Sequence, residues 1–360
     1  MTPALASRVG KIILAGALAA GATWWLLQNP ITSVSSSKPT ALLTHIPTPA
    51  IALPSTDATD DELLRVARLV VGRSPSPALA WARSSADPAL RQRLHLAVLR
   101  AWGEHSLADA AAWALNNEDD PRADLRAALA GAMRDPTGAV QLGQELLAQN
   151  SPYYHVYGDA LINALGAAGQ FSAALQFAAA APADYQEDWL AAAFRNWAQQ
   201  QPAQALQSLD AVADPTLRDS LFRAVVQGWS AAQPSALAAY ALALPEDQRD
   251  YALDQGLYQW SHQDPLGLAT WLVNVPPGQN YDAGAFFLLT ENNAVNLGPA
   301  TAMSWVQSIG DPALQRHSFD HVLQQWNQAD PAAARNYVDQ AGWLQPDDRS
   351  AILQNLDASW

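Results

Sequence analysis

Apolar residues recur at helical spacing along most of the chain after residue 57. Two segments show the pattern clearly, with apolar positions at Leu221, Phe222, Val225 and Trp229 in one and at Phe319, Val322, Leu323 and Trp326 in the other. Residues spaced in this way lie on one face of an α-helix. The pattern therefore predicts an all-α protein in which each helix buries one apolar stripe.

The helical pattern repeats with a period of about 32 residues, which is typical of stacked repeat arrays. In four units a tryptophan precedes a proline by five residues: Trp197 and Pro202, Trp229 and Pro234, Trp260 and Pro265, Trp326 and Pro331. The equivalent positions in the other units are Pro75, Leu107, Pro136, Phe171 and Pro299. A second proline follows in each unit, at Pro88, Pro121, Pro152, Pro182, Pro215, Pro245, Pro276, Pro312 and Pro346.

Each unit is therefore predicted to contain two helices. Aspartate precedes several of the second prolines, as in Asp87-Pro88 and Asp311-Pro312, and aspartate followed by proline is a common helix start. The longer A helix runs from the second proline to the tryptophan position, about 14 residues, and the shorter B helix covers about 11. The pattern is weaker near residues 131–170, where Gly131 and Gly166 occupy the tryptophan position.

Most tryptophans fit this repeat. Trp102, Trp197, Trp229, Trp260, Trp326 and Trp360 end A helices, and Trp81, Trp113, Trp271 and Trp305 lie six residues after the start of a B helix. Ten of the fourteen tryptophans are thus predicted to pack within the array and not to form an aromatic ligand site. The fold expected for residues 57–360 is a right-handed α-solenoid of about nine helical hairpins with a terminal capping helix.

One local motif, Gly169-Gln170-Phe171-Ser172-Ala173-Ala174, resembles the turn into the second helix of tetratricopeptide-like helical-hairpin repeats. The resemblance covers the architecture of residues 60–360. It implies a helical-hairpin fold and the general habit of binding other proteins, and it assigns no role to an individual residue. The succession of a short anchor, a linker and repeats is similar to membrane-anchored repeat proteins of bacterial envelopes.

Residues 12–27 form an uncharged, mostly apolar run preceded by Arg8 and Lys11. This predicts a transmembrane signal-anchor with residues 1–11 in the cytoplasm. A cleavable signal peptide is the alternative, because Ala20-Gly21-Ala22 resembles a cleavage site. Residues 28–56 contain five prolines and many serines and threonines, which predicts an extended linker. Both alternatives place the bulk of the chain on the periplasmic side of the inner membrane.

The remaining chain is strongly acidic. The whole sequence has 20 basic and 34 acidic residues; three of the basic residues and none of the acids precede residue 57, so the charge beyond it is 17 − 34 = −17. Such a surface disfavours nucleic acid and anionic lipids as partners. The sequence contains no cysteine, which excludes disulfides, zinc–cysteine sites and thiol catalysis.

Three polar or aromatic groups invite a functional interpretation, and each also has a structural one. His317 and His321 share one helix face, as metal ligands need, but no third ligand is apparent, so exposed histidines on a solvated or interface surface are the favoured interpretation. Tyr153, Tyr154, His155 and Tyr157 could form a recognition surface or a core cluster. Arginines near the starts of A helices could bind carboxylate or phosphate or pair with neighbouring acids; they are Arg91, Arg126, Arg218, Arg249, Arg316 and Arg349.

The best candidate for a partner groove is the face of the A helices opposite the apolar stripe. Its predicted residues are Asp188, Arg195, Ser220, Arg223, Tyr251, Asp254, Tyr258, His317 and His321. No catalytic, phosphate-loop or dinucleotide motif is found, so no enzyme activity and no cofactor are predicted.

The sequence favours a membrane-anchored scaffold or assembly factor that binds envelope proteins. The alternatives are an all-α enzyme or small-molecule binder with its site in the concave groove, and a structural subunit of a membrane protein complex.

Overall fold

The computed structural model describes residues 51–72, 75–117, 120–290 and 297–358. Over these residues the protein contains 19 α-helices and no strand, so the all-α prediction is confirmed. The predicted membrane segment, residues 12–27, and most of the predicted linker lie outside the described residues. Within the described part of the chain, no helix has both the length and the apolar character needed to span a bilayer.

The helices alternate in length along the chain. The A helices are α1 (Asp60–Val71), α3 (Pro88–His105), α5 (Pro121–Ala132), α7 (Tyr154–Ala167), α9 (Ala183–Gln200), α11 (Pro215–Ala232), α13 (Glu246–Gln263), α15 (Gln279–Thr290), α18 (Pro312–Ala329) and α20 (Pro346–Ala358). The B helices are α2 (Pro75–Arg83), α4 (Leu107–Leu115), α6 (Thr137–Ala148), α8 (Phe171–Ala179), α10 (Pro202–Ser208), α12 (Pro234–Ala241), α14 (Pro265–Leu272), α17 (Pro299–Ser308) and α19 (Pro331–Gln340). A short 3₁₀ turn, η1 (Leu209–Ala211), follows α10.

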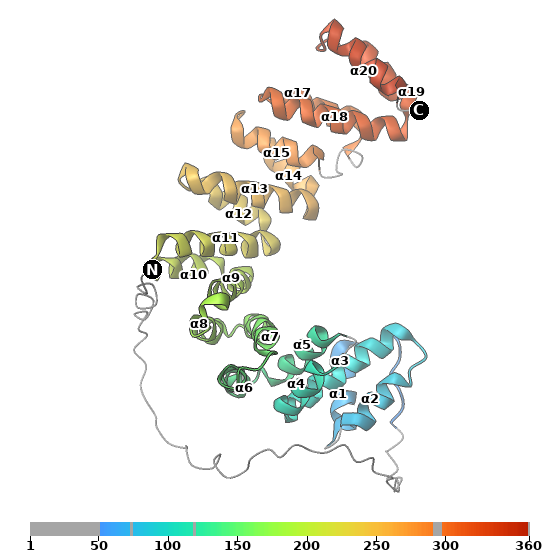
Figure 1. The fold of residues 1–360 in the computed structure, drawn as a ribbon. Helices are drawn as coiled ribbons and strands as arrows, with labels where there is room; N and C mark the ends of the chain where they lie inside the picture. The colour runs from blue at the N-terminus through green and yellow to red at the C-terminus, as the bar shows by residue number, and fades with distance from the viewer. Residues whose placement is uncertain (1–50, 73–74, 118–119, 291–296, 359–360) are drawn as a thin grey trace. The chain divides into compact units, whose positions relative to one another are not determined.

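Helices pack against near neighbours in the sequence (Figure 1). Each A helix from α1 to α15 contacts the next described A helix, ending with the α15–α18 contact, and each B helix packs between its own A helix and the following one. The described helices thus form consecutive pairs, from α1 with α2 to α18 with α19, followed by α20. Contacts of this local kind are typical of a repeat architecture.

Several helices begin at the aspartate–proline pairs that the sequence predicts as helix starts. Asp87, Asp214 and Asp311 each accept hydrogen bonds from two backbone N–H groups in the first turn of α3, α11 and α18, and a proline follows each aspartate. Pro136, Pro182 and Pro245 lie one residue before their helices. The start of α1 was not predicted, although Thr59 and Glu62 form a capping box there.

The A helices are longer than predicted, because they continue past the tryptophan. α3, α9, α11, α13 and α18 each have 18 residues. The residue four positions after the tryptophan donates its backbone N–H to the tryptophan carbonyl and also begins the next helix. This corner residue is Ser106, Gln201, Gln233, Asp264 or Asp330, with φ between −151° and −141°. A single residue therefore turns the chain from each of these A helices into its B helix.

The tryptophan of the A helix meets the aromatic residue of its own B helix. Ring centroids are 6.2 Å apart for Trp102 and Trp113, and 5.6 Å apart for Trp260 and Trp271. Trp229 with Tyr240 and Trp326 with Tyr337 are separated by 5.0 and 5.3 Å. These pairs are eleven residues apart in the sequence, which confirms that this spacing serves packing. Trp360 lies outside the described residues.

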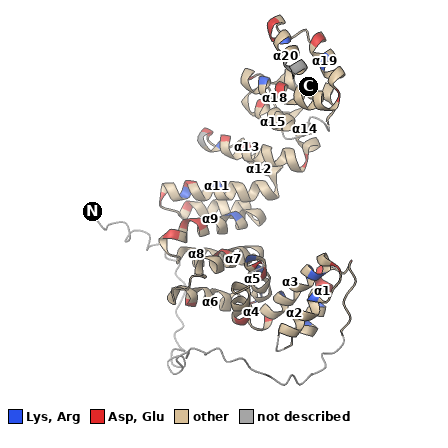
Figure 2. Ribbon diagram, turned by 45° about the vertical axis from the view of Figure 1, so that its right-hand side comes forward, with Lys and Arg blue, Asp and Glu red and all other residues tan. Residues whose placement is uncertain are grey.

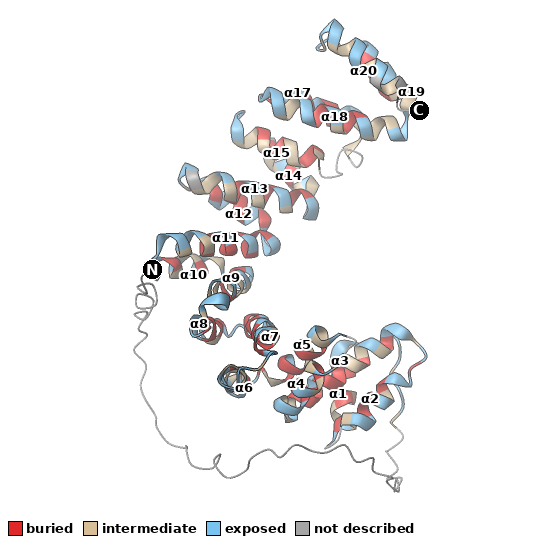
Figure 3. Ribbon diagram, in the orientation of Figure 1, coloured by how far each residue is buried: buried red, intermediate tan, exposed pale blue. Residues whose placement is uncertain are grey.

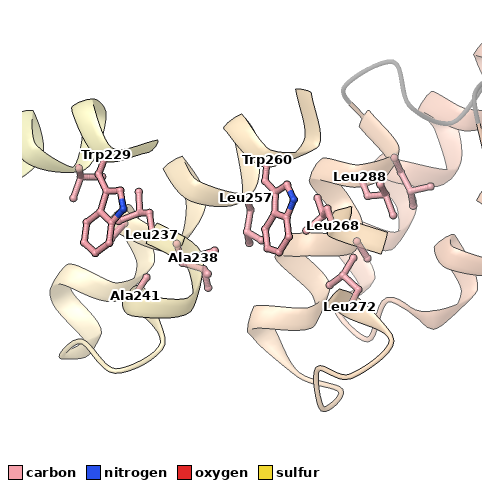
Figure 4. Packing of buried hydrophobic residues seen from close by; sticks show 14 of the residues in the cluster. Trp229, Leu237, Ala238, Ala241, Leu257, Trp260, Leu268, Leu272 and Leu288 are labelled. Atoms are coloured by element: carbon pink, nitrogen blue, oxygen red, sulfur yellow. The ribbon is translucent and has the colours of Figure 1, made fainter. Parts of the chain in front are cut away.

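The core runs through the helix pairs and has no single centre. Figure 4 shows one stretch, in which Trp229 and Leu237 pack within one pair and Trp260 and Leu268 within the next. Small residues such as Ala238 and Ala241 are fully buried between helices, which lets backbones approach closely. Buried and exposed positions share the same helices, as Figure 3 shows.

The chain enters this array through a fixed segment. The indole N–H of Trp81 donates to the carbonyl of Ile51 at 3.0 Å, and the guanidinium of Arg93 donates to the carbonyl of Ala58 at 2.6 Å. Arg93 also pairs with Asp60 at 2.7 Å. Residues 51–58 are therefore held against α2 and α3 before α1 begins.

Candidate functional site

The predicted partner face lies on α9, α11, α13 and α18. Asp188, Arg195, Arg223, Asp254, Tyr258 and His317 are exposed, and Ser220, Tyr251 and His321 are half-buried. The A helices that carry these residues are neighbours in contact from α9 to α13. Residues far apart in the sequence are thereby brought to adjacent helices.

A chain of polar contacts links three of these helices. Arg195 of α9 donates to the side-chain oxygen of Gln227 of α11 at 3.2 Å, and the amide of Gln227 donates to the hydroxyl of Tyr251 of α13 at 3.4 Å. The guanidinium of Arg223 lies 5.7 Å from the centre of the Tyr251 ring and pairs with Asp219 at 3.1 Å. Exposed polar groups on α9, α11 and α13 therefore satisfy one another across the helix boundaries.

Aromatic contacts continue this surface toward α18. The Tyr258 ring lies 6.1 Å from Phe287 and 4.5 Å from His262. Further along, Phe286 of α15 lies 5.4 Å from His317 of α18. His317 thus packs on an aromatic ring of the preceding A helix.

His321 differs from the prediction that both histidines are exposed. Its side chain is half-buried, and its Nε2 lies 2.8 Å from the side-chain nitrogen of Gln325. The neighbouring Val322 is fully buried, so His321 sits at the edge of the apolar stripe. Among the described residues, no group of three or more His, Asp or Glu is arranged to hold a metal ion.

One carboxylate of the face has an altered acidity. Partial desolvation by the neighbouring helices raises the pKa of Asp254 above its ordinary value although the residue is exposed overall, and the negative charge of Asp250 raises it further. The ionised form of Asp254 is therefore disfavoured, and a cation placed beside it would relieve the repulsion.

Three of the six recurrent arginines near A-helix starts have a structural role that neither interpretation predicted. Arg218 donates to the carbonyl of Val212 at 2.6 Å, Arg249 to that of Leu244 at 3.2 Å, and Arg349 to that of Ala341 at 2.7 Å. Each guanidinium satisfies backbone carbonyls left free where the preceding B helix ends. Only Arg316 of this set forms an ion pair in the described residues, with Asp348 at 3.8 Å.

The tyrosines near residue 155 divide between the two interpretations. Tyr157 is fully buried and donates to the carbonyl of Ala139 at 2.9 Å, and burial raises its pKa. Tyr154 is buried 5.2 Å from the ring of Trp189. Tyr153 is exposed. The core interpretation therefore holds for Tyr154 and Tyr157.

A second candidate site, absent from the predictions, lies on α1, α3, α5 and α7. It is an open hollow of about 630 Å³ whose lining includes Arg68, Arg100, Arg126 and Arg134, one carboxylate, Glu104, and small residues of α5 and α7. Two smaller hollows adjoin it: one of about 320 Å³ shares Arg126 and Asn163, and one of about 250 Å³ shares Arg100 and Ala130. We call the largest of these three, the hollow of about 630 Å³, the arginine hollow.

The hollow has a distinct charge, and Figure 2 shows arginine positions in blue on α1, α3 and α5, which line it. Arg68 holds Glu104 with two hydrogen bonds of 2.7 and 2.6 Å. These bonds lower the pKa of Glu104, and the charges of Arg134 and Arg100 lower it further. The guanidiniums of Arg100, Arg126 and Arg134 form no hydrogen bond or ion pair with the described residues. One carboxylate thus faces four arginines.

Two glycines allow the helix crossing beside the hollow, and one of them, Gly131, lines it. A Cβ on Gly103 would lie 1.9 Å from the carbonyl oxygen of Ala128, and one on Gly131 would lie 2.0 Å from that of Arg100. The backbones of α3 and α5 therefore touch at this crossing, which only glycine permits. Gly131, which the sequence pattern places at the tryptophan position, lies in the structure at a close helix crossing, and Ala132 is the residue that matches the tryptophan of α11.

The charge distribution along the sequence could have signalled this site. Residues 57–180 hold ten arginines and fourteen acids, so their formal charge is 10 − 14 = −4, whereas residues 181–360 hold seven arginines and twenty acids, 7 − 20 = −13. The averaged charge of the whole chain conceals this difference. No family model matches the chain, and no curated protein or solved structure matches it significantly.

Proposed function

We propose that this protein is a membrane-anchored scaffold or assembly factor that binds other proteins on the extracytoplasmic side of the inner membrane. In this proposal the helix pairs form a tetratricopeptide-like α-solenoid, residues 12–27 are the anchor, and the A helices line the partner groove. The observation that carries it is the linked surface on α9, α11 and α13, where Arg195, Arg223 and Tyr258 are exposed beside half-buried Tyr251.

The composition of that surface supports protein binding. Tyrosine and arginine are enriched among the residues that contribute most to protein–protein interfaces. The contacts among Arg195, Gln227 and Tyr251 hold the side chains in place before a partner arrives. Side chains that are already ordered lose less conformational entropy on binding.

The alternative of an all-α enzyme or small-molecule binder calls for a closed pocket with mutually hydrogen-bonded acids. In the described part of the chain, the arginine hollow is open and its single carboxylate, Glu104, is held by Arg68. A structural subunit of a membrane complex is the other alternative. It predicts that exchange of residues 12–27 for an unrelated span abolishes association.

Site-specific crosslinking in native membranes tests the proposal. A photoreactive residue replaces Arg223 or Tyr258, and matched controls carry it at Ala203 of α10 or Ala236 of α12, which are exposed on B helices. We expect one or a few specific proteins to be captured from the A-helix positions and not from the controls. Capture of no specific protein, or equal capture from all four positions, contradicts the scaffold.

The topology is tested separately. Protease added to the outer face of the inner membrane should digest residues 57–360, whereas residues 1–11 should remain protected. Protection of the helical region from protease would refute export.

A further inference from the structure

We propose that the arginine hollow binds a short acidic segment of a partner protein in extended conformation. The inference rests on the proposed scaffold function and assigns it a second binding surface, on α1, α3, α5 and α7. Its argument begins from two helix crossings that share one backbone geometry.

The α3–α5 crossing and the α9–α11 crossing are equivalent. A Cβ on Gly131 would lie 2.0 Å from the carbonyl oxygen of Arg100, and a Cβ on Gly228 would lie 2.0 Å from that of Arg195. Arg100 and Arg195 each stand two residues before the tryptophan of their helix. The two glycines therefore define a common register for comparing the flanking side chains.

At these matched positions, Arg195 has a hydrogen-bond partner, whereas Arg100 has none among the described residues. Gln227 immediately precedes Gly228 and accepts a hydrogen bond from Arg195. The residue immediately before Gly131 is Ala130, which has no polar side chain. The arginine at the matched position is therefore hydrogen-bonded at the α9–α11 crossing. At the α3–α5 crossing it has no such bond with the described residues.

The second arginine of each crossing shows the same contrast. Arg223 stands five residues before Gly228 and pairs with Asp219. Arg126 stands five residues before Gly131, and the residue four positions before it is Arg122. An acid that neutralises one arginine is therefore replaced by a like charge that repels the other.

The hollow already shows how it would receive a carboxylate. Glu104 is bound by Arg68 through both of its oxygens, which is the paired geometry that guanidinium groups favour. Arg100, Arg126 and Arg134 line the same hollow, and among the described residues their guanidinium groups form no hydrogen bond or ion pair. A ligand bearing several carboxylates would satisfy them and relieve their mutual repulsion.

The shape and surroundings of the hollow favour a short peptide. The hollow is open and continues into two smaller hollows through Arg126 and Arg100, whereas small-molecule sites enclose most of their ligand. Packed helices lie about 8–10 Å apart, so four A helices span about 25–30 Å, which an extended chain rising about 3.3 Å per residue crosses in about eight residues. Asp60 lines one adjoining hollow, and Asp159 and Asp188 line the other, so acids flank the arginines on both sides and favour a short anionic segment over a long polyanion.

Fluorescence anisotropy with the full chain in an uncharged detergent tests this inference. The probe is a labelled eight-residue peptide in which glutamate alternates with serine, and the control peptide carries glutamine in place of glutamate. One variant combines Arg100→Gln, Arg126→Gln and Arg134→Gln. A matched control removes the same charge from exposed positions outside the hollow by combining Arg65→Gln, Arg83→Gln and Arg316→Gln. Circular dichroism confirms that each variant keeps its helix content.

A third variant leaves every charge in place. Ala130→Gln introduces at the α3–α5 crossing the amide that Gln227 supplies at the α9–α11 crossing, so that Arg100 gains an internal partner. We expect the hollow variant to weaken binding of the glutamate peptide at least tenfold and Ala130→Gln to weaken it severalfold. The charge-matched control should stay within twofold of the unaltered protein, and the glutamine peptide should not bind.

Several outcomes would overturn the inference. They are no binding of the glutamate peptide, an equal loss in the hollow variant and its control, and unchanged binding in Ala130→Gln. Inorganic phosphate or single-stranded DNA of the same charge binding the hollow at least as tightly would assign it to phosphate groups instead. If crosslinking from Arg223 and Tyr258 still captures a specific partner while the peptide fails to bind, this inference falls alone; if crosslinking captures none, the scaffold function falls.

Discussion

The α3–α5 and α9–α11 crossings share a backbone contact and differ in what surrounds it. Gly131 and Gly228 let the helices touch in the same way, yet Ala132 occupies the position that Trp229 holds one residue after the glycine. Around Gly228 the polar side chains bond one another, whereas beside Gly131 Arg100 and Arg126 form no hydrogen bond or ion pair with the described residues. The comparison teaches that the glycine determines how closely the helices approach. The residues around it determine whether the polar side chains bond one another or stay available for a ligand.

Removing Trp229 should have the largest effect. Trp229→Ala makes α11 resemble α5 at this position and deletes a buried ring that packs against Tyr240. We expect a loss of about 3–5 kcal/mol in the free energy of unfolding, concentrated in the helices beside α11 and measured by hydrogen exchange. Trp343→Ala is the control, because Trp343 is exposed. An equal loss for both variants would show that the corner position is not special.

The glycines should come next, and both crossings should respond alike. Gly131→Ala and Gly228→Ala each force a methyl group against a backbone carbonyl, at a cost of about 1–3 kcal/mol. Gly138→Ala is the control, since nothing lies within 4 Å of the added carbon, and it should leave stability unchanged or raise it slightly. Denaturant unfolding measures all three. If Gly131→Ala left the free energy of unfolding unchanged while Gly228→Ala lowered it, the two crossings would not share the same close contact.

Glu104→Gln should change the pH dependence of stability in the α3–α5 region alone. The pKa of Glu104 is lowered in the folded protein, chiefly by its hydrogen bonds with Arg68. Its ionised form therefore stabilises the fold above the ordinary glutamate pKa, about 4.3, and this contribution is lost as the pH falls through the lowered value. The unaltered protein should be more stable than the variant at neutral pH, and the difference should vanish in acid. A constant difference at all pH values would assign the effect to packing.

Asp254→Asn should have the smallest effect and the opposite sign. The pKa of Asp254 is raised in the folded protein by burial and by Asp250, so this residue favours folding at low pH and loses that contribution as the pH rises through the raised value. At neutral pH the variant should be more stable by a few tenths of a kcal/mol, about the range of surface substitutions. Asp320→Asn, on the exposed side of α18, provides the control. A destabilised Asp254→Asn variant would mean that the carboxylate has a favourable partner.

The helix pairs could be predicted from the sequence because their signals are local. Proline, aspartate caps and the five-residue spacing from Trp260 to Pro265 act within one or two turns, and the structure confirms the helices that they mark. The start of α7 at Tyr154, two residues after Pro152, shows the limit of such signals. The polar surface on α9–α13 was predicted by residue, although the contact between Gln227 and Tyr251 was not.

The arginine hollow could not be predicted in the same way, because it depends on distances between helices. Arg68 and Arg100 come from α1 and α3, Arg134 comes from the turn after α5, and the three share no motif. Whether Arg100 has a polar neighbour depends on Ala130, thirty residues later, through a crossing that Gly103 and Gly131 make possible. To recognise this from the sequence, one must align the unit that contains Gly131 with the distant unit that contains Gly228. The length of the repeat varies too much near residue 131 for such an alignment.

The docking of residues 51–58 also determines how a mechanical load would enter the molecule. Tension applied through residues 1–50 reaches the hydrogen bond from Trp81 to Ile51 and that from Arg93 to Ala58 before it reaches the first turn of α1. These bonds connect to the second and third helices, so the force is shared between two helix pairs and does not peel the first helix from its end. Residues 51–58 thus attach to α2 and α3 through these two hydrogen bonds. The arginine hollow, which α1 and α3 help to line, lies next to this attachment.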